Sequence, residues 1–324
     1  MRARCLACGL PIDGISSGEY HVSCARSFFG MNDIPVFPYS ADEINQLARE
    51  LVLSRSTVPG VQAKLSVHLD RSGSANRLTI VGFNGGYILK LPTETYPEIT
   101  ESEHFGMTLG ALCGLKTAPC ALLRLQSGGL AYLTRRLDRM DGVKHMLDMC
   151  QLTNRDTDRK YSGSHEQVTK VIKAVSASSG LDLLEYFGQV VYSYLLGNSD
   201  MHLKNYSMLR EHNGDWHLSA GYDLLPVKTL MPDDHDDLAL TLNGKKSRLN
   251  RLDFERFAAS ANIVGTRFSR QLAAFCELFR QKLPEALERS FLSEEFKAKL
   301  LIQIRQRLES IFPAPMELLG RVEV

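Results

Sequence analysis

The residues best suited to chemistry lie in a short polar loop and in the turn that follows it. The loop contains Asp200 and Asn205, and Asp223 comes next in the chain. Phosphoryl transfer needs a carboxylate to orient and deprotonate the acceptor hydroxyl, and an amide and a second carboxylate to hold Mg²⁺ against the phosphates. Asp200, Asn205 and Asp223 supply these groups in that order, and Mg²⁺ prefers a few oxygen ligands of this kind. The pattern therefore predicts a phosphotransferase site.

Two basic residues lie in the same loop. His202 and Lys204 would steady the loop or meet the transferring phosphate. The alternative interpretation is that Asp200 and Asn205 only form a turn after an apolar helix, because Asp and Asn are common turn residues. A base, an amide and a downstream carboxylate in the right order favour the functional interpretation of the set.

Two lysines upstream could bind nucleotide phosphates. Gly60 would let the backbone approach phosphate oxygens that Lys64 could pair with, although a glycine after a proline is also typical of a plain turn. Lys90 lies in an apolar strand, with Glu101 and Glu103 on the next expected helix. A lysine that points inward needs an anion, whereas one on a solvent-facing side of a strand does not.

The amino terminus indicates a different chemistry. Cys5-x-x-Cys8 and His21-x-x-Cys24 are separated by a dozen residues. Three thiolates and one imidazole suit a tetrahedral zinc site, and a site filled by four protein ligands is structural. The alternative interpretation is three reduced cysteines with a surface histidine. A zinc knuckle would serve equally as a docking surface for DNA or for a partner protein.

The elements that position these residues change type along the chain. Helical spacing predicts a helix over 41–53, alternation predicts strands over 64–69, 77–81 and 87–91, and a helix over 101–112 precedes strands over 121–125 and 130–134. From about residue 143 helical spacing dominates and predicts helices over 165–178, 181–196, 252–262, 266–282 and 293–312. The expected class is α+β.

Length and composition set limits on the function. The 324 residues exceed the usual domain size of about 100–200, so two lobes with a cleft between them are expected. The formal net charge of +1 gives no case for bulk binding to nucleic acid or to an anionic membrane. The sequence has neither an apolar run long enough to span a bilayer nor a signal core after Met1, which predicts a cytoplasmic protein.

Seven sequence blocks, in the same order, resemble the HipA-like serine/threonine kinases of bacterial toxin–antitoxin systems. They are V-x-G-V-Q-x-K-L-S at 58–66, Y-I-L-K-L-P at 87–92, Y-P-E-x-x-E-S-E-x-F at 96–105, Y-L-T-R-R-L-D-R at 132–139, H-M-x-D-M-C-Q-L at 145–152, G-N-S-D-x-H-x-K-N-x-S at 197–207 and Y-D-L-L-P at 222–226. The resemblance implies a bilobal protein-kinase-like fold, to which the Cys/His spacing adds a zinc-knuckle-like segment at 1–30. An N-lobe at 31–134 would carry the ATP-binding loop and a mixed antiparallel sheet, and an all-helical C-lobe at 135–324 would carry the catalytic loop.

The resemblance also implies roles for individual residues. Asp200 would be the catalytic base, Asn205 and Asp223 the Mg²⁺ ligands, and Lys90 the phosphate-binding lysine. The remaining ATP-binding residues would be Val58, Gly60, Lys64, Arg135, Leu137, Gln151, His202 and Tyr222. Autophosphorylation of the glycine-containing loop would fall on Thr57, with Ser54 and Ser56 as the other hydroxyls.

Partners follow from the same resemblance. The short N-terminal part favours the HipT variant, in which a small protein, HipS, supplies the missing region beside a DNA-binding antitoxin, HipB. The protein substrate would be an aminoacyl-tRNA synthetase, and direct contact with nucleic acid or membrane is not expected. Two rival functions are a small-molecule phosphotransferase, which would not explain the blocks at 58–66 and 145–152, and an inactive scaffold that binds an antitoxin or DNA, which would not explain the intact set of polar residues.

Overall fold

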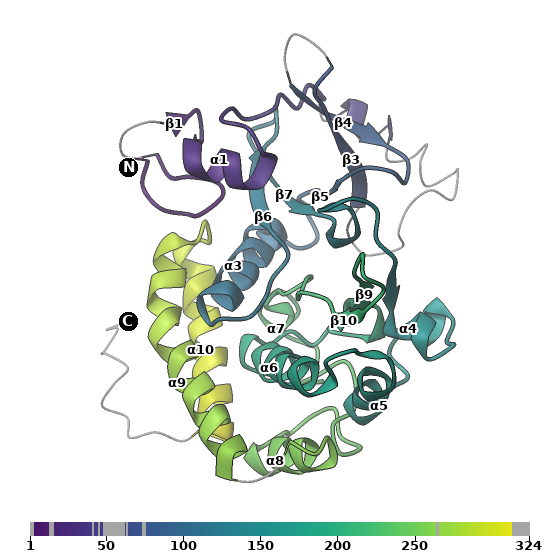
Figure 1. Ribbon diagram of the computed structural model, residues 1–324. Helices are drawn as coiled ribbons and strands as arrows, with labels where there is room; N and C mark the ends of the chain where they lie inside the picture. The colour runs from purple at the N-terminus through teal and green to yellow at the C-terminus, as the bar shows by residue number, and fades with distance from the viewer. Residues whose placement is uncertain are drawn as a thin grey trace.

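The structure is a computed structural model that describes most of the chain (Figure 1). The described residues are 3–12, 16–40, 42–44, 46–47, 62, 64–72, 76–263 and 266–312. A small N-terminal segment and an antiparallel sheet lie above a larger, mainly helical part in Figure 1. Among the described residues, no helix is both long and apolar enough to cross a membrane. The helix expected over 41–53 falls largely outside the described residues.

The N-terminal segment folds as a small unit. A short hairpin of β1 (Ser16–Ser17) and β2 (Tyr20–His21) leads into α1 (Val22–Phe29). Gly30 ends the helix with φ of +72°, a backbone conformation that glycine adopts without steric cost. Phe28 and Phe29 are buried and pack against Tyr87, so the segment shares its core with the sheet.

The sheet has five antiparallel strands in the order β4-β3-β5-β7-β6. The strands are β3 (Lys64–Asp70), β4 (Arg77–Val81), β5 (Tyr87–Lys90), β6 (Cys120–Arg124) and β7 (Leu130–Arg135). Lys64 of β3 lies directly opposite Lys90 of β5. Because directly opposed residues of antiparallel strands point to the same face, this register brings the two lysines together.

Helix α3 (Ile99–Leu112) connects the sheet to the rest of the molecule. It packs on β6 and β7 and against α9 (Thr266–Arg289), and most of its residues are buried. A helix buried nearly all round would ordinarily be apolar, but α3 carries Glu103 and His104 in its interior. These buried polar residues require specific partners, which lie in the two sites described below.

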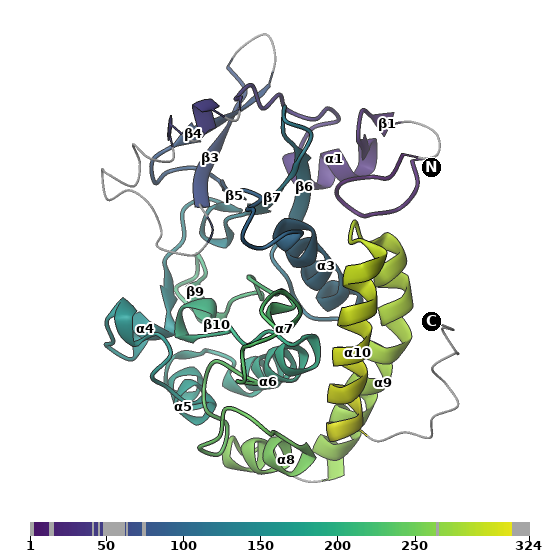
Figure 2. The same ribbon diagram turned by 180° about the vertical axis from the view of Figure 1, so that it is seen from behind.

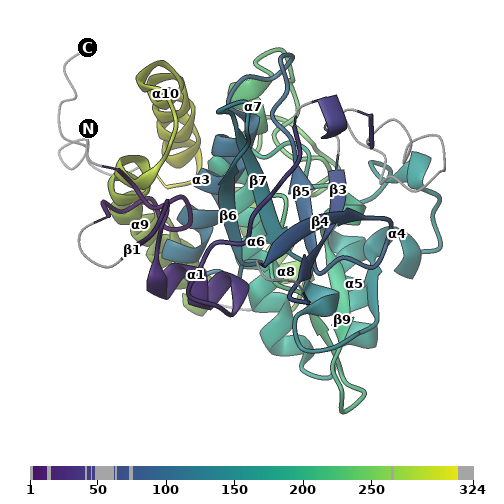
Figure 3. The same cartoon turned by 90° about the horizontal axis from the view of Figure 1, so that it is seen from above.

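The larger part is built on a buried central helix, α6 (Ser179–Leu196). The other helices are α4 (Met149–Leu152), α5 (His165–Val175), α7 (Val227–Leu230), α8 (Arg251–Ser260) and α10 (Glu294–Ile311), with 3-10 turns at Leu137–Arg139, Thr157–Arg159 and Leu203–Asn205. Figure 2 shows α9 and α10 side by side along one side of the molecule. Seen from above in Figure 3, β1 lies near α9, whereas α4 lies on the far side of the sheet.

The predicted α+β class, with an antiparallel sheet followed by helices, is confirmed. The expectation of an all-helical second lobe needs one correction, because a three-stranded antiparallel sheet lies within it. Its strands are β8 (Met146–Asp148), β9 (Ser207–Arg210) and β10 (Trp216–Leu218), in the order β10-β9-β8. Strand β9 directly follows the polar loop and pairs with β8, and β8 leads directly into α4. The small sheet therefore links the polar loop to α4.

Candidate active site

A cavity of about 1140 Å³ lies between the five-stranded sheet and the helical part. Residues from both sides line it, as expected for a ligand bound between two lobes. The predicted site residues that line the cavity are Lys64, Lys90, Arg135, Leu137, Gln151, Asp200, His202, Lys204, Asn205, Tyr222 and Asp223. The predicted residues Ser54, Ser56, Thr57, Val58 and Gly60 lie outside the described residues.

The end of α6 positions the polar loop. Gly197 ends the helix with φ of +79°, and its Cβ-free backbone lies close to the side chain of Lys228. The chain then alternates polar residues with the fully buried Met201 and Leu203, which anchor it in the core. The polar residues between these anchors are therefore held toward the cavity.

Hydrogen bonds fix the orientation of the loop amides. Asn205 Nδ2 donates to the backbone oxygen of Asp200 at 3.0 Å, and Asn198 Nδ2 donates to the backbone oxygen of Asp223 at 2.8 Å. Because Asn205 uses its nitrogen in this bond, its carbonyl oxygen is left for a cation or a donor. Asn198 joins the loop to the segment that carries the second carboxylate.

Asp223 accepts hydrogen bonds from two lysines. Lys90 Nζ lies 2.6 Å from Asp223 Oδ1 and 2.6 Å from Glu103 Oε1, and Lys64 Nζ lies 3.3 Å from Asp223 Oδ2. The two ammonium groups and two carboxylates balance in charge, which makes their burial tolerable. The glutamate that pairs with Lys90 is thus Glu103, whereas Glu101 accepts from its neighbour Thr100.

The environment of these groups shifts their pKa values. Burial by itself would raise the pKa of Asp223, but Lys64 and Lys90 outweigh burial and hold that pKa below its usual value. Burial would lower the pKa of Lys90, but Asp223 and Glu103 raise it. Burial raises the pKa of Glu103, partly offset by Lys90. Asp223 and Lys90 are consequently both charged near neutral pH.

Asp200 is contacted by a tyrosine that the sequence patterns did not indicate. The hydroxyl of Tyr161 donates to Asp200 Oδ1 at 2.5 Å, and the Tyr161 ring meets the ring of His202 edge-on with centroids 5.2 Å apart. Burial and the Asp200 carboxylate raise the pKa of Tyr161, so it remains a donor. Nothing in the local sequence around Tyr161 points to this role.

His202 has an unfilled hydrogen-bonding position. It is 6% exposed, and among the described residues nothing hydrogen-bonds its buried Nδ1. Burial lowers the pKa of His202, which keeps the imidazole neutral at pH 7. A buried polar atom without a partner costs free energy in the folded protein.

The remaining predicted residues are tied to the framework of the cavity. Lys204 Nζ pairs with Asp148 Oδ2 at 2.9 Å, and Asp148 also caps α4 in a reciprocal capping box with Gln151. The hydroxyl of Tyr222 donates to the backbone oxygen of Lys204 at 2.9 Å. Asp148 was missed by the sequence patterns, although it is the conventional cap residue before Met149.

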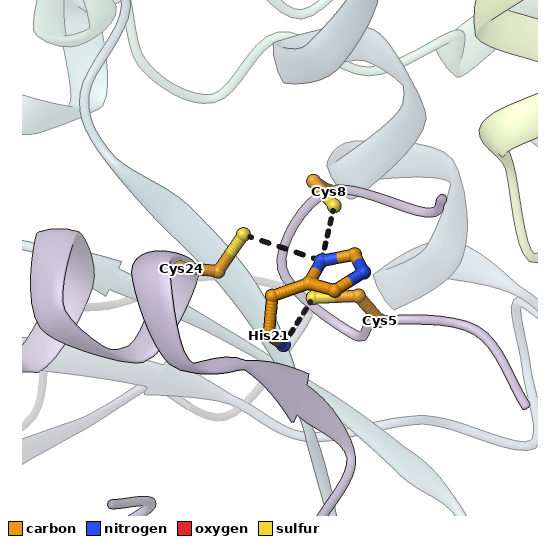
Figure 4. A group of neighbouring side chains, drawn as sticks. All are labelled: Cys5, Cys8, His21 and Cys24. Atoms are coloured by element: carbon orange, nitrogen blue, oxygen red, sulfur yellow. Dashed lines mark hydrogen bonds between the residues drawn. The ribbon is translucent and has the colours of Figure 1, made fainter. Parts of the chain in front are cut away.

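The amino-terminal cysteines and histidine form a second cluster (Figure 4), and none of the four lines the cavity. One ligand atom from each of Cys5, Cys8, His21 and Cys24 lies within 4.8 Å of the others. Cys8 Sγ is 3.4 Å and Cys24 Sγ 3.7 Å from His21 Nδ1. The structure therefore brings together the four predicted ligands, and zinc itself stays a prediction.

A family model and two relatives each match most of this chain. The family model of the HipA-like C-terminal domain matches residues 56–286, which is well over half of the chain. Two Sinorhizobium fredii proteins provisionally named kinases, Y4dM and Y4mE, are 29% and 30% identical to this chain over 224 and 221 residues. These matches cover 64% and 65% of this chain but 54% and 51% of those proteins. The chain thus spans about half the length of these relatives.

A solved structure has a similar fold. It is the complex of HipA, HipB and operator DNA from the toxin–antitoxin system of Shewanella oneidensis MR-1, matched with a TM-score of 0.69. The match covers 84% of this chain and 71% of that chain at 19% sequence identity. At this identity the similarity establishes the shared fold and leaves the activity to be argued from the site.

Proposed function

This chain belongs to the family of HipA-like C-terminal domains, and on that premise we propose that it is an ATP-dependent serine/threonine protein kinase. The observation that carries the proposal is the meeting of Asp200, Asn205 and Asp223 with the Lys90–Glu103 ion pair around one cavity. These groups meet the requirements of phosphoryl transfer, which depends on positioning and charge stabilisation more than on covalent chemistry.

Each group has a role that its contacts support. Asp200 accepts the proton of the acceptor hydroxyl as that oxygen attacks the terminal phosphorus, and ADP leaves. The hydroxyl of Tyr161 already donates to Asp200, which is the type of hydrogen bond an acceptor hydroxyl makes. Lys90, held by Glu103, binds nucleotide phosphate, and the neutral His202 lines the nucleotide site.

The donor set also fits Mg²⁺. Asn205 and Asp223 offer the oxygen ligands that this ion prefers, and both side chains are oriented by hydrogen bonds. When bound, Mg²⁺ would neutralise charge on the phosphates. Arg135, Leu137, Gln151, Lys204 and Tyr222 complete the nucleotide site in this proposal, with Val58, Gly60 and Lys64 on the phosphate side.

We also propose a biological role for the chain, as the toxin of a toxin–antitoxin system. It would phosphorylate an aminoacyl-tRNA synthetase and also its own loop at Thr57, Ser56 or Ser54. The related fold was solved with HipB and operator DNA. That complex supports a HipB-like antitoxin as partner, and a HipS-like protein and the HipT variant are further parts of the proposal. The proposed division of the chain is a segment at 1–30, an N-lobe at 31–134 and a C-lobe at 135–324.

The test compares the purified wild-type chain with Asp200→Asn. Both proteins are incubated with Mg²⁺, radiolabelled ATP and a mixture of aminoacyl-tRNA synthetases. We expect Asp200→Asn to lose about 10²–10⁴-fold in transfer rate, the usual contribution of a general base, with an unchanged circular dichroism spectrum. Equal labelling by the two proteins would contradict the assignment. Phosphate found by mass spectrometry only outside residues 54–57 would contradict loop autophosphorylation.

A further inference from the structure

The four side chains at the amino terminus have the spacing of a tetrahedral metal site. With Zn–S bonds of about 2.3 Å and a Zn–N bond of about 2.0–2.1 Å, a tetrahedron has N–S edges of about 3.5–3.6 Å. The distances from His21 Nδ1 to Cys8 Sγ and Cys24 Sγ are 3.4 and 3.7 Å. The cluster is therefore preformed to within the movement of a side chain (Figure 4).

Hydrogen bonds around the cluster prepare the ligand atoms. His21 Nε2 lies 2.9 Å from the backbone oxygen of Pro11, and because a carbonyl only accepts, Nε2 carries the proton. Nδ1 is left with its lone pair directed at the sulfurs, the arrangement usual for metal-bound histidine. The backbone N–H of His21 also donates to the sulfur of Cys5 at 3.4 Å, which favours a thiolate.

The turn that carries Cys5 and Cys8 fits closely against the end of α9. Gly9 closes the turn with its N–H bonded to the oxygen of Cys5 at 2.8 Å and adopts φ of +73°. A Cβ at this glycine would lie 1.9 Å from the backbone oxygen of Arg289, so no other residue fits. Arg4 donates to the backbone oxygen of Glu288 at 2.7 Å, and its guanidinium lies over the ring of Phe291.

The same turn contacts the sheet and α3. The N–H of Leu122, on edge strand β6, donates to the backbone oxygen of Leu6 at 2.8 Å. On the other side, His104 Nε2 lies 3.0 Å from the backbone oxygen of Ala7, which sits between the two cysteines. His104 is 1% exposed and adjoins Glu103, the partner of Lys90. The turn thus supports the helix segment that holds the buried ion pair.

We propose that Cys5, Cys8, His21 and Cys24 bind one Zn²⁺, and that the bound metal holds the 5–8 turn against α3 and so positions Glu103 beside Lys90. The metal site is independent of the proposed kinase function. The second half of the proposal is a structural link from the metal to the Lys90 site. Only the consequence of this link for catalysis rests on the proposed kinase function. Both halves are therefore tested by readouts that need no activity.

The first experiment measures metal in the full chain, expressed with zinc in the medium and purified without chelator. We expect one Zn²⁺ per chain in the wild type and in the control Cys276→Ala, which removes a cysteine outside the cluster, and loss of most of the zinc in Cys8→Ala and Cys24→Ala. Replacement by Co²⁺ should give the visible absorption of a tetrahedral thiolate site. A wild-type chain without zinc and without that Co²⁺ spectrum would overturn the site, even if the variants fail to fold.

The second experiment follows amide hydrogen exchange before and after a chelator removes the metal. We expect exchange over Glu103–Met107 of α3 to become about tenfold faster, the factor for losing one buried hydrogen bond, while α5 at His165–Val175 is unchanged. The variant His104→Ala should show the same change in α3 while retaining its zinc, because it breaks the link and spares the ligands. Loss of zinc with unchanged exchange in α3 would overturn the link. Absent kinase activity would affect neither readout.

Discussion

The cleft and the N-terminal cluster gather reactive side chains in opposite ways. In the cleft, Lys64 and Asp223 meet although 159 positions separate them, and each buried charge is balanced by another protein charge. The cluster draws all its ligands from the span between Cys5 and Cys24, and no protein cation balances its thiols within the contacts described. The charges of the cleft thus balance one another within the fold, whereas the cluster would be completed by the metal that we propose.

The largest expected effect comes from breaking the charge balance of the cleft. Lys90→Met should lower the free energy of unfolding by about 3–5 kcal/mol, because Glu103 and Asp223 are left without their common buried partner. The matched control is Lys64→Met, whose part-exposed ammonium makes one longer contact and should cost about 1 kcal/mol or less. Urea unfolding measures both. Equal losses would mean that the cleft does not depend on Lys90 in particular.

Removing the metal should have the next largest effect. With free Zn²⁺ at about 100–1,000 times its dissociation constant, chelation should lower the free energy of unfolding by about 3–4 kcal/mol. Urea unfolding of the wild type with and without chelator measures this difference, and Cys8→Ala should show no further loss on chelation. A wild type insensitive to chelator would mean that the cluster is a group of ordinary reduced cysteines, and the contrast between the two regions would disappear.

Acidification should destabilise the folded protein through His165, which is buried in its neutral form. His165 is fully buried, and burial lowers its pKa to about 3, below the value of about 6.5 in the unfolded chain. The folded state therefore binds fewer protons, so stability from this group is complete above pH 6.5 and declines below it. Between pH 7 and pH 5 the decline should be about 2 kcal/mol.

Urea unfolding at the two pH values measures this decline, and His165→Asn provides the control. Asparagine does not titrate in this range, so the variant should lose less stability on acidification than the wild type does. Tyr186 hydrogen-bonds His165 Nδ1 at 2.7 Å, and Tyr206 and Phe257 face its ring. Within the described part of the chain, burial alone shifts the pKa of His165, and no cation or carboxylate offsets it. The same decline in both proteins would assign it to other groups.

The smallest effect is expected at Tyr161. Tyr161→Phe removes the hydrogen bond to Asp200 and should lower kcat about three- to tenfold, as expected for one hydrogen bond at a part-exposed position, without changing KM for ATP. Tyr96→Phe, at another tyrosine that lines the cavity, is the control and should leave both constants unchanged. Steady-state kinetics over ATP concentration give the two constants. A change confined to KM would assign Tyr161 to nucleotide binding instead of base positioning.

Features that depend on neighbouring residues in the sequence were predictable. The helix expected over 165–178 is observed at His165–Val175, and that expected over 293–312 at Glu294–Ile311, because apolar spacing and capping residues are local signals. The spacing of Cys5, Cys8, His21 and Cys24 likewise predicted their meeting. All of the predicted cleft residues within the described part of the chain line one cavity, although their chemical roles remain predictions.

Features that depend on which faces meet were not predictable. The sequence offered Glu101 and Glu103 equally, and only the rotation of α3 against the sheet selects Glu103 for Lys90. Strand β8 has three residues, too few to show alternation, so its pairing with β9 was missed. The contact of Tyr161 with Asp200 joins two loops 39 positions apart, and no periodic signal connects them.

The docking of Arg4 on the end of α9 has a consequence for biosynthesis. The contact joins positions 284 residues apart, so the first residues to leave the ribosome must wait for nearly the whole chain before they find their partner. The proposed metal ligands, all within the first 24 residues, emerge together and early. A nascent chain could therefore load the proposed metal during translation, whereas the contacts of Arg4 with Glu288 and Phe291 form only after synthesis has passed Phe291.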